Sequence, residues 1–201
     1  MISLIINTCA GGAVDTKSTS GQSHLMRAYA LQNIIIPRYL DDPFIHEVIV
    51  VGEWKPSASG RYTYIHSPSV YHSAVDALHQ RQEAAEEASG DILIFTHDDH
   101  MLACGEDIAL AEGQDVLCPR RVTYLRTVDG ERVNNGEDGS YITGHFAVYR
   151  REVIDVCPWG AVPKVFTWDM EHTAMIREAG FAIDWNGPVV YDIEYGAHPW
   201  R

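Results

Sequence analysis

Short apolar runs alternate with segments of helical periodicity along the first half of the chain. The apolar runs predict strands at Ser3–Cys9, Glu47–Gly52, Tyr62–His66 and Ile92–His97. Apolar residues at helical spacing predict helices over His24–Ile36 and Val70–Gly90. Pro37 is expected to end the first helix, and Gly90 to cap the second. The order β-α-β-β-α-β, with almost continuously apolar strands, predicts a parallel sheet covered by helices on both faces.

The second half of the chain is less regular. Alternating apolar and polar positions predict strands over Asp115–Leu125 and Tyr141–Arg150, as in a mixed sheet. Between them, Val128–Ser140 is rich in turn-forming residues and predicts a mobile loop. A short helix is expected over Trp168–Phe181, ending at Gly180, and one or two short strands should follow it.

Composition and charge limit the classes of function. An apolar fraction of 46% and a charged fraction of 21% are typical of a folded globular protein. No repeat or linker divides the chain, so one domain over residues 1–201 is expected. The net charge of −13 argues against broad binding to nucleic acid or anionic lipid, since both favour a basic surface. The N-terminus has no basic leader and the four cysteines form no C-x-x-C pair, which indicates a cytoplasmic protein with no membrane segment.

The strand that ends at His97 runs directly into two adjacent carboxylates and a second histidine, Asp98-Asp99-His100. Ligands of open parallel sheets bind beyond the carboxyl ends of the strands, where this cluster falls. If the backbone stays extended there, Asp98 and His100 point to one face, and His97 and Asp99 to the other. A carboxylate and an imidazole on one face can hold a divalent cation and leave positions open for a diphosphate. An ordinary polar turn at a strand end is the alternative.

Five motifs, in order along the chain, resemble those of glycosyltransferases of the A-type fold, and most of all the family 2 group. Asp98-Asp99-His100 resembles a D-x-H variant of the D-x-D motif that binds Mn²⁺ or Mg²⁺ and the diphosphate of a nucleotide sugar. "RQEAAEEASGD" resembles the helix before that strand, and "EVIVVGE" resembles the family's second strand. "ITGHFAVYRREVI" resembles the segment that borders the donor sugar and the acceptor. "WDMEHTAMIREAGF" resembles the helix that carries the general base, at the position of Asp169.

The resemblance implies an α/β fold: a single Rossmann-like nucleotide-sugar transferase domain with a central, mostly parallel mixed sheet flanked by helices. Residues 1–100 would form the nucleotide-sugar-binding half and residues 101–201 the acceptor-side half. The implied reaction is metal-dependent transfer of a sugar, with inversion, from a nucleoside-diphosphate sugar to a hydroxyl acceptor. A UDP-sugar is the expected donor. The chain departs from the family at His97, at Trp168 and after the first strand, where "NTCAGG" replaces "P-T-Y-N-R".

Site residues follow from the motifs. Asp169 is expected to be the catalytic base, although an acidic residue in the first turn of a helix also simply stabilises that helix. The expected metal ligands are Asp98, Asp99, His100 and, near the C-terminus, His198. The donor-binding candidates are Thr8, Glu53, Arg61, Arg81 and His97. The acceptor-side candidates are Gly144, His145 and Trp168.

Two alternatives stay open at this stage. A sugar nucleotidyltransferase or a metal phosphohydrolase would also use a metal at the acidic cluster, and Gly11, Gly12 and Lys17 are a weak form of the glycine-rich basic loop of a nucleotidyltransferase. A non-catalytic nucleotide-sugar-binding module would fit the altered motifs. The sequence does not identify the acceptor: a soluble molecule is favoured, with help from a partner or a second subunit of a homo-oligomer. The net charge disfavours a nucleic acid such as a modified DNA base.

Overall fold

A computed structural model describes residues 1–8, 26–68, 74–103, 108–126, 132–135, 141–142, 146–162 and 167–194. The predictions made for Gly144, His145 and His198 lie outside these residues, as do those for Gly11, Gly12 and Lys17. Among the described residues, no helix is both long and apolar enough to cross a membrane.

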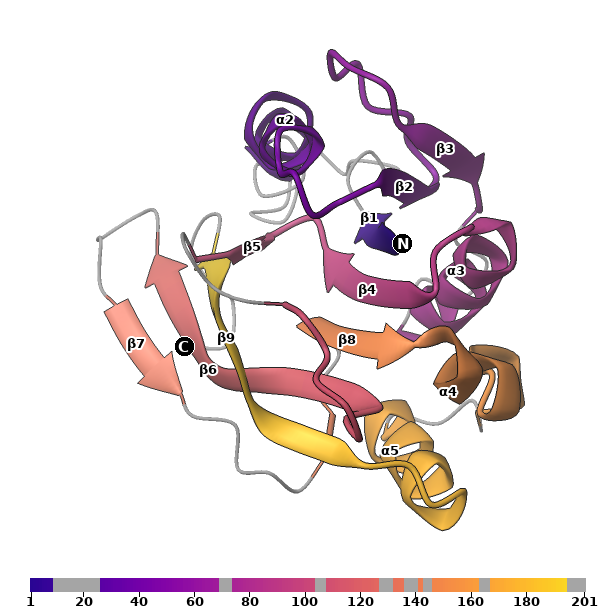
Figure 1. The fold of residues 1–201 in the computed structure, drawn as a ribbon. Coiled ribbons are helices and arrows are strands. Elements are labelled where there is room, and N and C mark those ends of the chain that lie inside the picture. Colours follow the sequence, from indigo (N-terminus) through magenta and orange to yellow (C-terminus); the bar gives the residue numbers. More distant parts are fainter. Residues whose placement is uncertain are drawn as a thin grey trace.

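One sheet runs through the described part of the chain (Figure 1). Its strands are β1 (Ile2–Thr8), β2 (Glu47–Gly52), β3 (Thr63–His66), β4 (Ile92–His97), β5 (His100–Leu102), β6 (Val116–Arg126), β7 (Arg132–Asn135), β8 (Phe146–Arg150) and β9 (Ile183–Glu194). They lie in the order β3-β2-β1-β4-β8-β6-β9-β5, with β7 beside β6. Strands β3, β2, β1, β4, β6 and β9 run in one direction, and β5, β7 and β8 in the other. The described sheet is therefore mixed and mostly parallel, as predicted.

Helices cover both faces of this sheet. On one face lie α3 (Ala74–Glu87), α4 (Arg151–Val156), the short 3-10 helix η2 (Trp159–Ala161) and α5 (Trp168–Glu178). On the other lies a helical stretch made of residues 26–30, the π-helical turn η1 (Leu31–Ile35) and α2 (Ile36–Leu40). Figure 1 shows α2 on the opposite side of the sheet from α3, α4 and α5. The predicted two-sided covering is confirmed.

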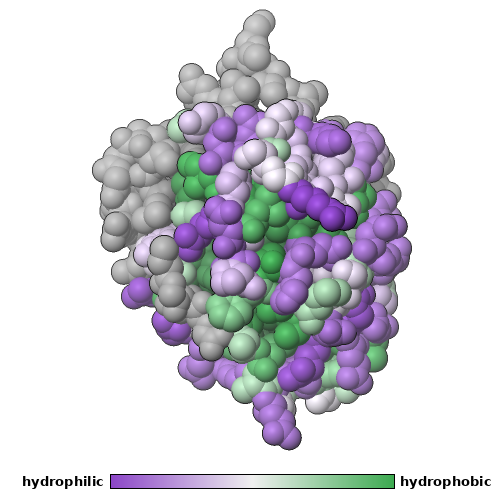
Figure 2. Space-filling model, turned by 45° about the horizontal axis from the view of Figure 1, so that its top comes forward, coloured by the Kyte–Doolittle hydropathy of each residue, from purple (hydrophilic) through white to green (hydrophobic). Residues whose placement is uncertain are grey.

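Each face of the sheet buries a core of its own. Successive strand residues point to opposite faces, so Ile5 packs with Leu78 of α3, while its neighbours Leu4 and Ile6 pack with Leu31 on the other face. The continuous apolar runs of β1, β2 and β4 follow from this burial on both sides. Figure 2 shows one surface of the molecule, where a strip of hydrophobic residues runs between hydrophilic ones. Such exposed apolar surface is common on folded proteins.

The first helix does not end at Pro37, contrary to the prediction. Pro37 lies in the first turn of α2, where the missing N–H of a proline leaves no helical hydrogen bond unmade. The preceding turn is widened, and the Ile36 N–H donates to the carbonyl of Leu31, five residues back. The Asn33 side-chain amide also donates to the carbonyl of Tyr29, at 2.8 Å. The π-helical turn thus lets the helix continue through a proline.

Three other local predictions need correction, and one strand was not predicted at all. Val128–Ser140 contains the strand β7, which pairs with β6. Tyr141 precedes rather than belongs to β8, which begins at Phe146. Near the C-terminus, where one or two short strands were expected, there is one strand of 12 residues, β9. Gly187 lets its backbone pass close to β6, since a Cβ there would lie 2.3 Å from the Cys118 carbonyl oxygen. The three-residue strand β5 was not predicted.

Gly90 does not cap α3. The helix ends at Glu87, and Gly90 does not have the left-handed conformation of a helix cap. It lies instead against β1, where its N–H donates to Ser3 Oγ at 2.8 Å. A Cβ on Gly90 would lie 2.6 Å from Ser3 Oγ and 2.9 Å from the Met1 carbonyl oxygen. Close approach of the two backbones is therefore the reason for this glycine.

The Gly90→Ala variant is expected to lose about 1–3 kcal/mol of unfolding free energy, because the new methyl group must push β1 aside. Gly160→Ala is the matched control, since its Cβ would meet only the Gln82 side chain, at 3.7 Å. Urea unfolding followed by circular dichroism measures both. Equal stability of the two variants would contradict the close approach.

Candidate functional site

Asp98 and Asp99 form a turn between two strands: β4 ends at His97, and β5 begins at His100. The backbone is therefore not extended through the cluster, and the condition for the predicted alternation of its side chains is not met. Asp98 faces back toward β1, where its Oδ2 accepts a hydrogen bond from Thr8 Oγ1 at 2.8 Å. Asp99 and His100, which were expected on opposite faces, reach the same site.

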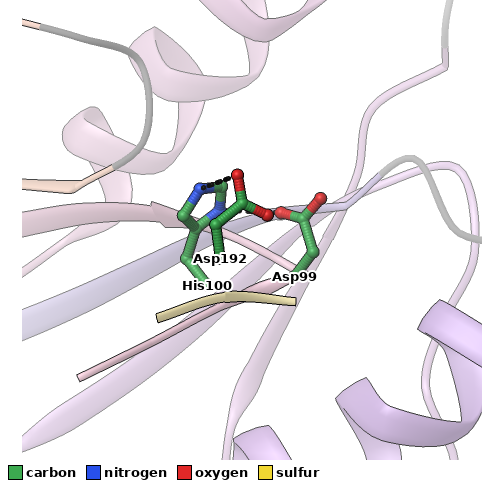
Figure 3. Close-up of side chains that lie close together, drawn as sticks. All are labelled: Asp99, His100 and Asp192. Carbon is green, nitrogen blue, oxygen red and sulfur yellow. Dashed lines mark ion pairs between the residues drawn. The ribbon is translucent and has the colours of Figure 1, made fainter. Parts of the chain in front are cut away.

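A third acidic residue joins that site from β9. Strand β5 pairs with β9 so that His100 lies opposite Asp192. The His100 Nδ1 lies 2.7 Å from Asp99 Oδ1, and its Nε2 lies 3.5 Å from Asp192 Oδ2. Figure 3 shows the three side chains gathered together, and one ligand atom from each lies within 4.8 Å of the others. Asp192 was missed in the sequence, where its signal is an acidic residue inside the apolar run "VVYDI".

Arg27 bridges the two carboxylates of the turn. Its Nη1 lies 3.2 Å from Asp98 Oδ1, and its Nη2 pairs with Asp99 Oδ2. The Asp98 side chain is 1% exposed and that of Asp99 10%, whereas 25% of the Arg27 side chain is exposed. A cation from the helical stretch thus compensates two buried negative charges, which would be costly without a partner. Arg27 was not predicted as a site residue.

Protonation states in the cluster follow from these pairs. Burial alone would raise the pKa of Asp99, but the His100 imidazole and the Arg27 guanidinium outweigh it and hold that pKa well below its usual range. Burial alone would lower the pKa of His100, but Asp99 and Asp192 outweigh it and raise the pKa to about 10. At neutral pH and without a metal, the imidazole is therefore a cation between two carboxylates.

The donor set of Asp99, His100 and Asp192 fits a divalent metal. Two carboxylates and an imidazole from three separate positions converge, all three residues are buried, and their ligand atoms lie close enough to meet on one ion. Oxygen ligands with one nitrogen suit Mn²⁺, and the oxygens also suit Mg²⁺. Metal binding has to displace the imidazole proton, since the nitrogen lone pair is the ligand.

Arg81 lies in a second buried group next to the cluster. Its side chain is almost fully buried, with the guanidinium carbon 4.8 Å from the centre of the Trp159 ring and 5.2 Å from that of Trp168. Burial lowers the pKa of Arg81 to about 10, against the opposing effects of Tyr149 and Asp169, so the side chain is charged at neutral pH. Its Nη2 lies 3.2 Å from His97 Nε2. Since arginine only donates, that imidazole nitrogen accepts.

The remaining predicted residues lie at separate places. Asp169 is in the first turn of α5, half-buried, and its Oδ1 accepts a hydrogen bond from the Met170 N–H. Trp168, next to it, is buried and contacts Arg81, so contacts run from α5 through Arg81 to His97. Glu53 is half-buried just after β2, and Arg61 is exposed before β3. The structure thus brings Thr8, Asp98, Asp99 and His100 together, whereas Glu53 and Arg61 belong to the segment between β2 and β3.

Three solved structures are similar to this chain to different degrees. The structure of GalNAc-T7 with UDP, GalNAc and Mn²⁺ has a TM-score of 0.58 and 10% sequence identity to this chain. The match covers 100% of this chain and 45% of the GalNAc-T7 chain. The bifunctional IspDF from Campylobacter jejuni has a TM-score of 0.51 and 10% sequence identity. Here the match covers 100% of this chain and 51% of the IspDF chain. The mannosyltransferase PcManGT from Pyrobaculum calidifontis, in complex with GDP-Man and Mn²⁺, gives a TM-score of 0.49 at 14% identity, over 99% of this chain and 58% of its own. No protein-family model and no curated protein matches the sequence.

The similarities to GalNAc-T7 and IspDF show the fold. The match to GalNAc-T7 over the whole chain confirms the A-type glycosyltransferase fold that the sequence motifs predicted. This chain spans about half the length of GalNAc-T7 and of IspDF. At an identity of 10%, the comparison does not extend to individual residues or to the reaction.

In metal-free protein, the His100 imidazole is expected to stay protonated at pH 8, and Asp192→Asn should lower its pKa. Because the folded-state pKa lies above the unfolded value of 6.5, this pairing stabilises the fold fully below about pH 6.5 and stops doing so as the pH rises toward 10. NMR titration of the imidazole measures the pKa directly. Asp184→Asn, on the same strand but bonded to Gln114, is the control. An imidazole that titrates near 6.5 would contradict the pairing.

Proposed function

We propose that the protein is a metal-dependent glycosyltransferase that moves a sugar from a nucleoside-diphosphate sugar to a hydroxyl acceptor. The observation that carries the proposal is the convergence of Asp99, His100 and Asp192 at the carboxyl end of β4. Ligands of open parallel sheets bind at this edge. The A-type fold, shared with a GalNAc-T7 structure that contains UDP and Mn²⁺, supports a nucleotide-sugar donor, and a UDP-sugar first of all.

In this mechanism Asp99, His100 and Asp192 would hold Mn²⁺ or Mg²⁺. The bound ion would supply Lewis-acid stabilisation of the negative charge that grows on the leaving diphosphate. Asp98 keeps the turn in place through its bonds to Thr8 and Arg27. Three ligands from the described residues suffice for such a site, and His198 stays a candidate for a further one.

Asp169 is the proposed general base. It would accept the proton of the acceptor hydroxyl as that oxygen attacks the anomeric carbon. A base on the side opposite the leaving diphosphate gives a single displacement and therefore inversion. Glu171 is the alternative base, since it is also acidic and in the first turn of α5, but it is exposed, whereas Asp169 is half-buried.

Arg81 and His97 are proposed as donor-side residues with different tasks. Because Arg81 is enclosed by aromatic rings, it acts by holding His97 rather than by reaching the diphosphate itself. With Nε2 engaged as the acceptor, a neutral His97 carries its proton on Nδ1 and can donate from there to the donor molecule. Glu53 and Arg61 are candidates for the nucleoside side, and Gly144, His145 and Trp168 for the acceptor side.

The metal and donor are tested together with a panel of nucleotide sugars, with and without Mn²⁺. A true donor at a hundredfold excess over its dissociation constant adds about 2.7 kcal/mol of stability, a rise of several degrees in the melting temperature. Asp192→Asn is expected to abolish the metal-dependent rise, and Asp184→Asn to keep it. A panel in which no nucleotide sugar raises the melting temperature, while a nucleoside triphosphate with a sugar phosphate is turned over, would favour a nucleotidyltransferase.

Catalysis is tested by release of the nucleoside diphosphate. Asp169→Asn should keep the metal-dependent stabilisation by the donor and lose turnover by about 10²–10⁴-fold, the usual contribution of a general base. Glu171→Gln is the matched control and is expected to retain turnover. If Glu171→Gln loses turnover instead, the base is Glu171. If the wild type binds a donor tightly without any turnover, the protein is a binding module.

A further inference from the structure

We propose that Arg27 is a phosphate-binding residue that neutralises the acidic turn in the metal-free protein and moves onto the diphosphate of the donor when metal binds. The first half of this inference rests on contacts in the structure. The second half rests on the proposed function, because it requires a nucleoside diphosphate at the same edge of the sheet.

The contacts place Arg27 as a bridge across two carboxylates. Its two terminal nitrogens bind separate residues, Asp98 and Asp99, rather than the two oxygens of one carboxylate. Asp99 is also the residue that the turn contributes to the group with His100 and Asp192. The guanidinium therefore binds a carboxylate that the proposed metal needs.

A metal bound to Asp99, His100 and Asp192 would repel the guanidinium of Arg27 in its present position. Both are cations, and they would share one carboxylate in a largely buried site, where charges are poorly screened. The metal also withdraws charge from Asp99 and so weakens its attraction for the guanidinium. Removing Arg27 should thus help a metal to bind when no diphosphate is present.

Arg27 is suited to leave this position without leaving the site. The Arg27 side chain is more exposed than those of the two carboxylates it bridges, at 25% against 1% for Asp98 and 10% for Asp99. A diphosphate that reaches the buried carboxylates from solvent would come within reach of the more exposed Arg27 side chain. The planar guanidinium binds phosphate oxygens through two parallel hydrogen bonds, so it exchanges carboxylate partners for phosphate partners.

A residue that merely holds the fold together would behave differently. Its loss would loosen the turn and weaken Mn²⁺ and Mn²⁺–diphosphate binding together. The exchange described here predicts effects of opposite sign on these two affinities, which is a difference that a structural role does not produce.

The test compares wild-type protein with Arg27→Met by titration calorimetry, first with Mn²⁺ alone and then with UDP at saturating Mn²⁺. Arg27→Met is expected to bind Mn²⁺ about tenfold more tightly and UDP about tenfold more weakly, the scale of one charge-assisted hydrogen bond. Arg38→Met is the matched control: Arg38 lies in the same helical stretch, but its Nη2 bonds the Leu102 carbonyl rather than a carboxylate. It should change neither affinity.

Each result decides a different point. Unchanged or weaker Mn²⁺ binding by Arg27→Met overturns the neutralising role, and unchanged UDP binding overturns the role toward the diphosphate; neither result affects the proposed function. If neither wild type nor variant binds Mn²⁺, the metal site itself is wrong and the proposed function falls with it. If Arg27→Met does not fold, Arg27→Lys carries the same test, since it keeps the charge but cannot bridge two carboxylates, and smaller changes of the same signs are expected.

Discussion

Three carboxylates buried within one small region are the constraint on which the site depends. Asp98, Asp99 and Asp192 are all buried, so their charges are expensive unless cations accompany them. The chain supplies an imidazolium from His100 and a guanidinium from Arg27. A divalent ion could take over this task, and for that reason the cluster suits exchange between the protein's own cations and a metal.

The fold brings these groups together from distant parts of the sequence. Thr8 lies at the end of β1, and Asp192 lies near the end of β9. Arg27 lies on the helical stretch that covers the face of the sheet away from α3, α4 and α5. The short strand β5 is the element that connects them, because its pairing with β9 sets His100 opposite Asp192. A second link passes from His97 through the buried Arg81 to Trp168 at the start of α5. Elements from the first and the second hundred residues therefore meet at the turn after β4.

Much of the fold could be predicted because its signals are local. The apolar runs of β1, β2 and β4 are long enough to identify strands buried on both faces, and Gly180 correctly marked the end of α5. What failed depended on tertiary contacts. Gly90 resembles a helix cap in sequence, but a glycine is needed there because the backbone of β1 passes too close for a side chain. Strand β7 forms only because β6 is available to pair with it.

The site was predictable in part for the same reason. The cluster after β4 is contiguous, so Asp98, Asp99 and His100 could be found from the sequence. Asp192 and Arg27 could not, because finding them needs the register of β5 on β9 and the position of the first helix.

The metal site is tested most directly by anomalous X-ray diffraction from crystals grown with Mn²⁺ and UDP. If Asp99, His100 and Asp192 form the metal site, a manganese peak lies within bonding distance of all three. A peak elsewhere, or none at this cluster, would contradict this assignment.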